Sequence, residues 1–240
     1  MHSEVTFFGL FKIPLFWLPA NTAVMLYIIA CLGLFSYFIS KRLKLVPNHT
    51  MQSIVELLIE GIKNLMEETM GRHGKKYFPF IATFGIYILI SNILGLIPGL
   101  LPPTSNLNTT AGLAVIVFAA THIIGVKEHG MKYVKHFMGP SIFSSPLKIW
   151  HIPLMILFTV LMLFVETISH LVRPVSLSLR LFGNIMGHEL IVGVLLMLMP
   201  LAYPLLAFST VIGVLVVFIQ AFIFSLLSMM YIGGALEEQH

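Results

Sequence analysis

The chain has 240 residues and a formal net charge of +4, with 58% hydrophobic but only 10% charged residues. Because an ordinary globular domain carries about 25% charged residues, this composition could not build a solvated surface, and a soluble fold is excluded. The basic residues lie in short loops beside apolar stretches, which favours membrane orientation over nucleic-acid binding. We therefore expect a single all-α domain, 1–240, that spans the lipid bilayer with about five helices.

Several apolar stretches with almost no charge are long enough to cross a membrane, for which about 20 residues are needed. They cover 21–40, 77–98, 150–172 and 201–231. The first stretch is followed by Lys41, Arg42 and Lys44, so the positive-inside rule places its end in the cytoplasm. The N-terminal segment 1–20 is therefore expected outside.

The segment 48–71 has apolar residues at helical spacing and charged residues on the other face. Its apolar positions are Ile54, Leu57, Leu58, Ile62 and Leu65, and its charged positions are Glu56, Glu60, Lys63, Glu67 and Glu68. We expect an amphipathic helix that lies along the cytoplasmic surface of the membrane. A docking face for a partner is the alternative interpretation.

A pair of membrane helices with an external loop is predicted over 77–126. The basic residues just before it are Arg72, Lys75 and Lys76. They hold its start inside, so the first helix crosses outward to the Pro- and Asn-rich loop 102–109. The return stretch 110–126 has about 17 residues, the lower limit for crossing, so we expect its helix to be irregular or to extend at the loop end. Its first polar residues, which cap the helix or line a path, are Asn108, Thr109 and Thr110.

The region 146–236 is predicted to form a long helical hairpin, with a turn at 199–204 that contains Pro200 and Pro204. Each helix would be about 50 Å long or longer, which exceeds the hydrocarbon thickness of about 30 Å, so both must tilt or bend. Pro174 is a predicted kink site because it lacks the N–H that would bond one carbonyl of the preceding turn. The C-terminus then returns to the cytoplasm.

Polar residues recur at steps of three or four along the first helix of this hairpin, so they share one side of it. They are Glu166, Ser169, His170, Arg173, Ser176, Arg180, Asn184 and His188. Glu189 falls about half a turn from Arg180 and faces another surface. A charge at mid-bilayer costs about 2.5–3.5 kcal/mol on insertion scales, so this stripe implies a water-filled path or a charged partner. Arg180 has no acidic residue one helical turn away, and its counter-charge is expected from elsewhere.

Taken singly, several of these residues have ordinary structural alternatives. Arg173 could snorkel or pair with Glu166 instead of lining a channel. The serines expected to bond to carbonyls of their own helix are Ser169, Ser176 and Ser178.

Two histidines and the one glutamine of the hairpin also have both a structural and a functional interpretation. His170 and His188 could be satisfied core residues, although a group that titrates near neutrality suits proton relay. In the second helix, Gln220 could bond between helices, or it could hold the guanidinium of Arg180 or line a path.

Several segments carry a specific resemblance to a known family. They are SNILGLIPG (91–99), PTSNLNTT (103–110), PVSLSLRLFGNIMGHEL (174–190) and QAFIFSLLSMMYI (220–232). In this order, and over nearly the whole chain, the sequence resembles the ATP synthase a subunit family.

The resemblance implies roles for individual residues. Arg180 matches the essential arginine that faces the rotating ring of c subunits. The positions that match the access path from outside are Asn184, His188, Glu189 and Gln220, and those toward the cytoplasmic exit are Glu166 and Ser169. Some relatives have a small residue where this chain has His188 and a histidine where it has Gly213.

The function that the resemblance implies is a proton-translocating stator subunit in a bacterial plasma (inner) membrane. Its partners would be the c-subunit ring, the peripheral stalk subunit b and the rest of the ATP synthase. Protons are the expected coupling ion, with sodium as the alternative, and no cofactor or metal is expected. ATP chemistry is expected on other subunits, because this chain has no GxxxxGK[ST] phosphate loop.

Two other classes of protein share parts of this pattern. A secondary transporter or a stand-alone proton channel also needs membrane carboxylates and histidines, but no internal repeat supports a two-halved transporter. The His188-Glu189 pair prompts the thought of a metalloprotease. HExxH requires a second histidine four residues after the first, however, and Val192 stands there.

Overall fold

The computed structural model describes residues 20–42, 50–97, 102–130, 133, 152–198 and 203–236. Over these ranges the chain is helical with short turns and has no strand, which confirms the all-α class. Five helices are long and apolar enough to cross a membrane: Thr22–Lys41, Gly74–Leu94, Leu107–His129, Leu157–Met197 and Pro204–Leu236. The expected external segment 1–19, most of the turn at 199–204 and the C-terminal residues after 236 lie outside the described residues.

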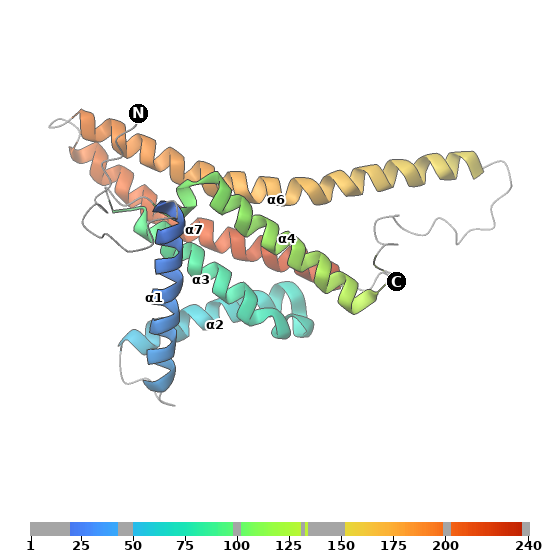
Figure 1. Ribbon diagram of the computed structural model, residues 1–240, viewed down its shortest axis with the longest axis horizontal. Coiled ribbons are helices and arrows are strands. Elements are labelled where there is room, and N and C mark those ends of the chain that lie inside the picture. The colour runs from blue at the N-terminus through green and yellow to red at the C-terminus, as the bar shows by residue number, and fades with distance from the viewer. Residues whose placement is uncertain are drawn as a thin grey trace.

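The hairpin dominates the fold and consists of α6, Ile152–Met197, and α7, Tyr203–Leu236. At the helical rise per residue α6 is about 70 Å long and α7 about 50 Å, which confirms the predicted excess over the bilayer. Pro174 lies inside α6, and the helix continues through it. Figure 1 shows α6 bent near its middle instead of broken.

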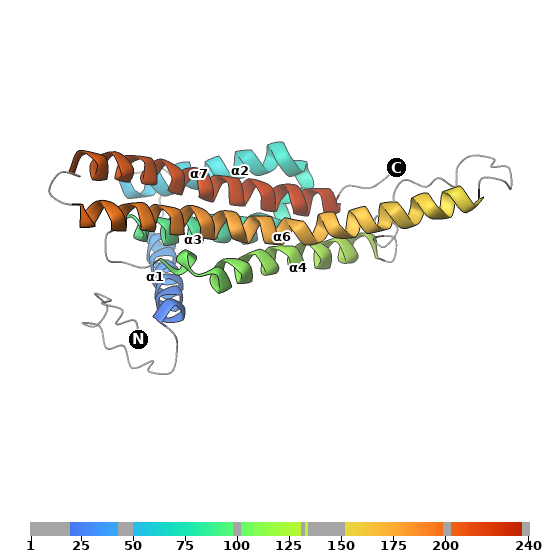
Figure 2. The same ribbon diagram turned by 90° about the horizontal axis from the view of Figure 1, so that it is seen from above.

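The first helix, α1, Ala20–Arg42, lies at a steep angle to the hairpin (Figures 1 and 2). The two helices of the hairpin lie side by side near their turn in both views, and the N-terminal half of α6 extends away from α7. If α1 crosses the bilayer near its normal, α6 and α7 must therefore be strongly tilted, as their lengths require.

The amphipathic helix α2, Thr50–Met70, forms as expected and packs its C-terminal part on α7. Its buried residues are Gln52, Met66 and Met70, with Ile62 and Leu65 partly buried beside them. Ile54 and Leu57, predicted on the same apolar face, are 55% and 73% exposed. The predicted face is therefore only partly the buried one, because among the described residues nothing covers Ile54 and Leu57, although Gln52 is buried in the same half of α2. These exposed apolar side chains suit a membrane surface, and that location stays a prediction.

The helical pair consists of α3, Phe78–Leu94, preceded by the 3₁₀ helix η2, Gly71–Tyr77, and of α4, Leu107–His129, preceded by η3, Pro103–Ser105. The return helix α4 has 23 residues and begins before residue 110, so it extends at the loop end. This is one of the two expectations for this helix. Its cap is Asn106, whose side chain accepts from the N–H of Asn108 at 2.9 Å. The prediction of caps at 108–110 is wrong, because those residues already belong to the first turn.

Two buried clusters hold the helices together. The first joins α1, α3, α4, α6 and α7 and includes Ile28, Ile88, Val117, Leu181 and Phe224. The second joins α2, α3, α4 and α7 and includes Met66, Ile81, Ile124, Met229 and Ile232. Together they fix the rotation of α6 and α7 about their own axes.

Candidate functional site on the long hairpin

The direction of Arg180 follows from the packed face of α6. Leu177, Leu181 and Ile185, spaced four apart, are 1%, 0% and 5% exposed and turn this face into the core. Arg180 therefore lies off that face and is exposed. Among the described residues, no carboxylate lies within ion-pair distance of it. The origin of its counter-charge, expected from elsewhere, stays a prediction.

On the N-terminal side of Arg180, titratable groups gather where α6 meets α4 and α7. We call this group the His170 cluster, and its members are His122, Tyr133, Glu166, His170, Arg173 and Tyr231. His170 is 5% exposed, and its Nε2 lies 3.2 Å from Oε1 of Glu166. Its ring centroid lies 5.3 Å from that of His122.

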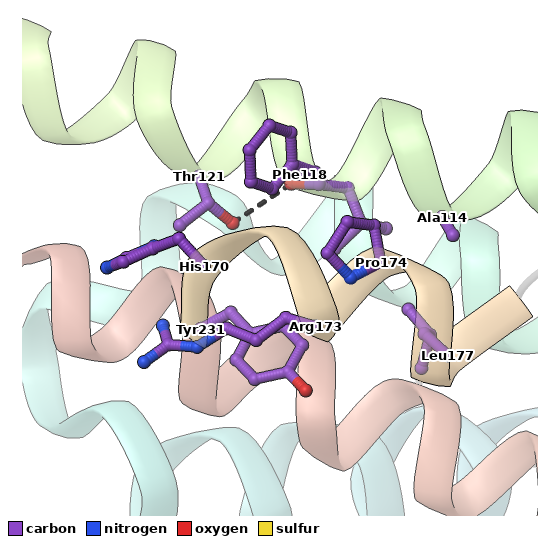
Figure 3. A pocket seen from close by; sticks show the side chains of 9 residues that line it. Ala114, Phe118, Thr121, His170, Arg173, Pro174, Leu177 and Tyr231 are labelled. Carbon is purple, nitrogen blue, oxygen red and sulfur yellow. Dashed lines mark hydrogen bonds between the residues drawn. The ribbon is translucent and has the colours of Figure 1, made fainter. Parts of the chain in front are cut away.

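Arg173 does not pair with Glu166, so that alternative is wrong. Its guanidinium lies 5.2 Å from the ring centroid of Tyr231 on α7, a cation–π distance, as Figure 3 shows. Glu166 is instead one helical turn from His170 and lies beside it. A gap of only about 10 Å³ remains between α4, α6 and α7 beside His170, room for about one water. The cluster is therefore tightly packed around His170, while the Glu166 side chain is 35% exposed at its edge.

Three members of the cluster, His122, Tyr133 and Tyr231, were missed by the sequence reasoning, although Tyr231 lies in one of the resembling segments. His122 Nδ1 and Tyr133 Oη lie 2.8 Å apart, a hydrogen-bond distance. A signal for His122 existed, because it is a titratable residue inside a predicted membrane helix. No sequence signal marked Tyr133, which follows that helix and reaches back to it.

On the C-terminal side of Arg180, a cleft of about 460 Å³ lies between α3, α6 and α7. We call it the His188 cleft; its polar lining includes Asn92, Asn184 and His188. Asn184 donates through Nδ2 to Oε1 of Gln220 at 2.7 Å. Gln220 thus bonds between the two helices of the hairpin, one of its two predicted alternatives, and this bond places it beside the cleft.

His188 lies against Gly213 of α7. A Cβ built on Gly213 would be 2.5 Å from Cε1 of His188 and 2.9 Å from its Nε2, closer than real contacts allow. The imidazole therefore fills the space that a side chain at 213 would occupy. This geometry fits the interpretation that the histidine has exchanged places with that of relatives across the helix pair.

The structure does not bring Glu189 to the residues that line the cleft. It is half-buried, and within the described ranges its Oε1 is buried without a hydrogen-bond partner. This agrees with its predicted position about half a turn from Arg180. Ser169 is half-buried between Glu166 and His170, and Ser178 donates to the carbonyl of Val175 at 3.0 Å, as expected for a helix serine.

Asn92 was not singled out in the sequence, although it lies in one of the resembling segments. It is 0% exposed, and its Oδ1 accepts from the hydroxyl of Thr104 at 2.9 Å. Its Nδ2 is buried and has no partner among the described residues, so water in the cleft is the natural acceptor for it.

Fold and site together define a multi-pass helical membrane protein whose long hairpin carries an exposed arginine between a tightly packed polar cluster and a wide cleft. Residues 22–233 match the family described as ATP synthase A chain. The chain is similar to ATP synthase subunit a of Geobacter sulfurreducens, 53% identical over 213 residues, which cover 89% of this chain and 86% of the relative. It is similar as well to ATP synthase subunit a of Trichlorobacter lovleyi, 48% identical over 222 residues, which cover 92% and 89%. The chain therefore belongs to the ATP synthase subunit a family.

Proposed function

We propose that this chain is the proton-translocating stator subunit of a bacterial rotary ATP synthase, with Arg180 facing the c ring. The observation that carries the proposal is the exposed guanidinium, unpaired within the described residues, between two polar regions of one helix. A permanent charge at the depth of a predicted membrane span requires an acidic partner or water, and the packing of α6 turns this one away from the core.

Arg180 would act on a carboxylate of the rotating ring. That carboxylate must be neutral while it faces lipid, because a bare charge there is expensive. Next to the guanidinium its ionised form is favoured, so it releases its proton. The fixed positive charge also repels cations and so separates the two proton paths.

The two half-channels would correspond to the two polar regions. The His188 cleft, with Asn184, His188 and Gln220, would admit protons from outside, and Glu189 would exchange them from the neighbouring face of α6. Glu166, Ser169 and His170 would release protons toward the cytoplasm. Because the two regions are offset along α6, a ring site can reload only after nearly a full turn, and the gradient becomes torque.

The assembly follows from the same proposal. The chain would be non-catalytic, with the c ring, the peripheral stalk subunit b and the remaining ATP synthase subunits as partners. Its N-terminus would lie outside and its C-terminus in the cytoplasm of a bacterial plasma membrane. Protons are the proposed ion, with sodium as the alternative.

The test is Arg180→Ala in the assembled complex, with Leu179→Ala as the matched control, because Leu179 is the exposed neighbour on α6. Gradient-driven ATP synthesis in vesicles should fall about 100-fold or more in the first variant, and passive proton leak should persist or rise. The control should retain synthesis. Normal synthesis by correctly assembled Arg180→Ala complexes would refute the role.

A further inference from the structure

His122 and Tyr133 extend the His170 cluster toward the end of α4. Polar contacts join Glu166 to His170 at 3.2 Å and His122 Nδ1 to Tyr133 Oη at 2.8 Å. Between these two pairs the His170 and His122 rings pack against each other, with their centroids 5.3 Å apart. Four titratable side chains from α6, α4 and the turn after α4 thus form one continuous series.

The backbone around α4 allows Tyr133 to lie beside His122. Gly130, directly after α4, has φ +57°, a conformation that glycine adopts readily. The N–H of Tyr133 then donates to the carbonyl of Gly130 at 3.1 Å. The Tyr133 ring lies directly on Gly125, where any Cβ would overlap Cε2. Two glycines are therefore needed for one tyrosine to reach His122.

The two rings are also held in orientation. Tyr133 is 6% exposed. The rings of His122 and Phe118 pack in a T-shaped arrangement, with their centroids 4.3 Å apart and an interplanar angle of 87°. Fixed rings keep a hydrogen bond short and aligned, which suits proton transfer better than mobile ones do. Burial raises the pKa of the Tyr133 hydroxyl, so the group stays protonated at neutral pH.

Packing alone does not account for the series. A buried histidine pair is no more stabilising than well-packed apolar residues of similar volume, since each polar group must recover its lost hydration. Titratable groups within a membrane helix typically mark a proton or ion pathway. His122 lies seven residues, or about 10 Å, before the end of α4, and the Tyr133 hydroxyl extends the series by one step of 2.8 Å.

We propose that His122 and Tyr133 are relay residues that continue the cytoplasmic half-channel from Glu166 and His170 to the hydroxyl of Tyr133. In each passage His170 gives its proton to His122. His122 releases a proton to the Tyr133 oxygen as Tyr133 releases its hydroxyl proton to water, so every group returns to its starting protonation. This inference rests on the proposed function and adds to it the last steps of proton release.

The experiment uses the whole complex in vesicles and compares Tyr133→Phe, His122→Gln and the control Phe118→Leu. Tyr133→Phe keeps the ring on Gly125 and removes only the hydroxyl. His122→Gln keeps a polar side chain that cannot titrate, and Phe118→Leu loosens the same ring without removing a proton carrier. The measurements are the rate of proton translocation and its solvent isotope effect in D₂O.

We expect His122→Gln to slow translocation about 10-fold or more, Tyr133→Phe to slow it less, and both to raise the isotope effect. Phe118→Leu should leave the isotope effect unchanged. Unchanged rates and isotope effects in both relay variants would overturn the inference, as would a slowing by His122→Gln with no change in isotope effect. Arg180→Ala distinguishes a failure of the relay from a failure of the proposed function. If Arg180→Ala abolishes synthesis while the relay variants behave normally, only the relay is refuted. If Arg180→Ala retains full synthesis, the proposed function itself is refuted.

Discussion

The His170 cluster and the His188 cleft lie on the same helix, on either side of Arg180, yet one is tightly packed and the other is wide. The gap beside His170 has a volume of about 10 Å³, and the cleft has a volume of about 460 Å³. The cluster brings together side chains that themselves titrate, whereas the cleft has a mostly apolar lining in which Asn92, Asn184 and His188 are polar, with room for several waters. If both conduct protons, the cluster must pass them between side chains and the cleft must pass them largely through water.

The largest effect that would distinguish the two regions is expected at Glu166. The gap beside His170 has room for about one water, which leaves little space to bypass a missing carrier, so Glu166→Gln should slow proton translocation about 100-fold in vesicles containing the assembled complex. Thr167→Val is the control, because Thr167 is exposed and its hydroxyl donates to its own helix, to the carbonyl of Leu163. Equal rates in the two variants would show that the cluster is a structural feature and not a path.

A smaller effect is expected from Glu189→Gln, which keeps the shape of the side chain and removes its proton exchange. Translocation should fall about 10-fold while the yield of assembled complex stays near normal, since water and His188 remain in the adjacent cleft. The yield and the proton uptake rate are measured on the same preparation. If uptake is unaffected, Glu189 does not belong to the path.

The smallest effect is expected at the contact between His188 and Gly213. Gly213→Ala should lower the rate a few-fold, because a methyl group there overlaps the imidazole and displaces it. The paired change His188→Gly with Gly213→His should recover most of the rate, since the imidazole returns to the same space from the opposite helix. If the paired variant is as slow as His188→Gly alone, an imidazole in this space is not sufficient to restore the rate.

The class of fold followed directly from composition and the lengths of the apolar stretches. The hairpin, the spans and the extension of α4 at the loop end were predictable, because a bilayer admits few ways to satisfy a backbone. Local details were less predictable: the cap of α4 is Asn106 and not 108–110. On α2 the apolar face alone could not reveal that Ile54 and Leu57 would be left uncovered.

The site was predictable only along α6 itself. Helical spacing placed Glu166 and His170 on one side of the helix, but it could not show that Arg173 faces Tyr231. Contacts between elements, such as Asn184 with Gln220, were open alternatives until the packing was known. Tyr133 lies beside His122 because Gly130 has a positive φ and because Gly125 has no side chain in the way. Helical periodicity reveals neither feature.

The central claim is that Arg180 faces an acidic rotor between two separate proton paths. The most direct measurement is a density map of the intact complex in a lipid environment that resolves this side chain. The account predicts the guanidinium at the depth of the hydrocarbon, pointing to a carboxyl-bearing helix of a ring, with the His188 cleft and the His170 cluster on opposite sides of that contact. A guanidinium turned to headgroups or bulk water, with no acidic side chain alongside, would contradict it.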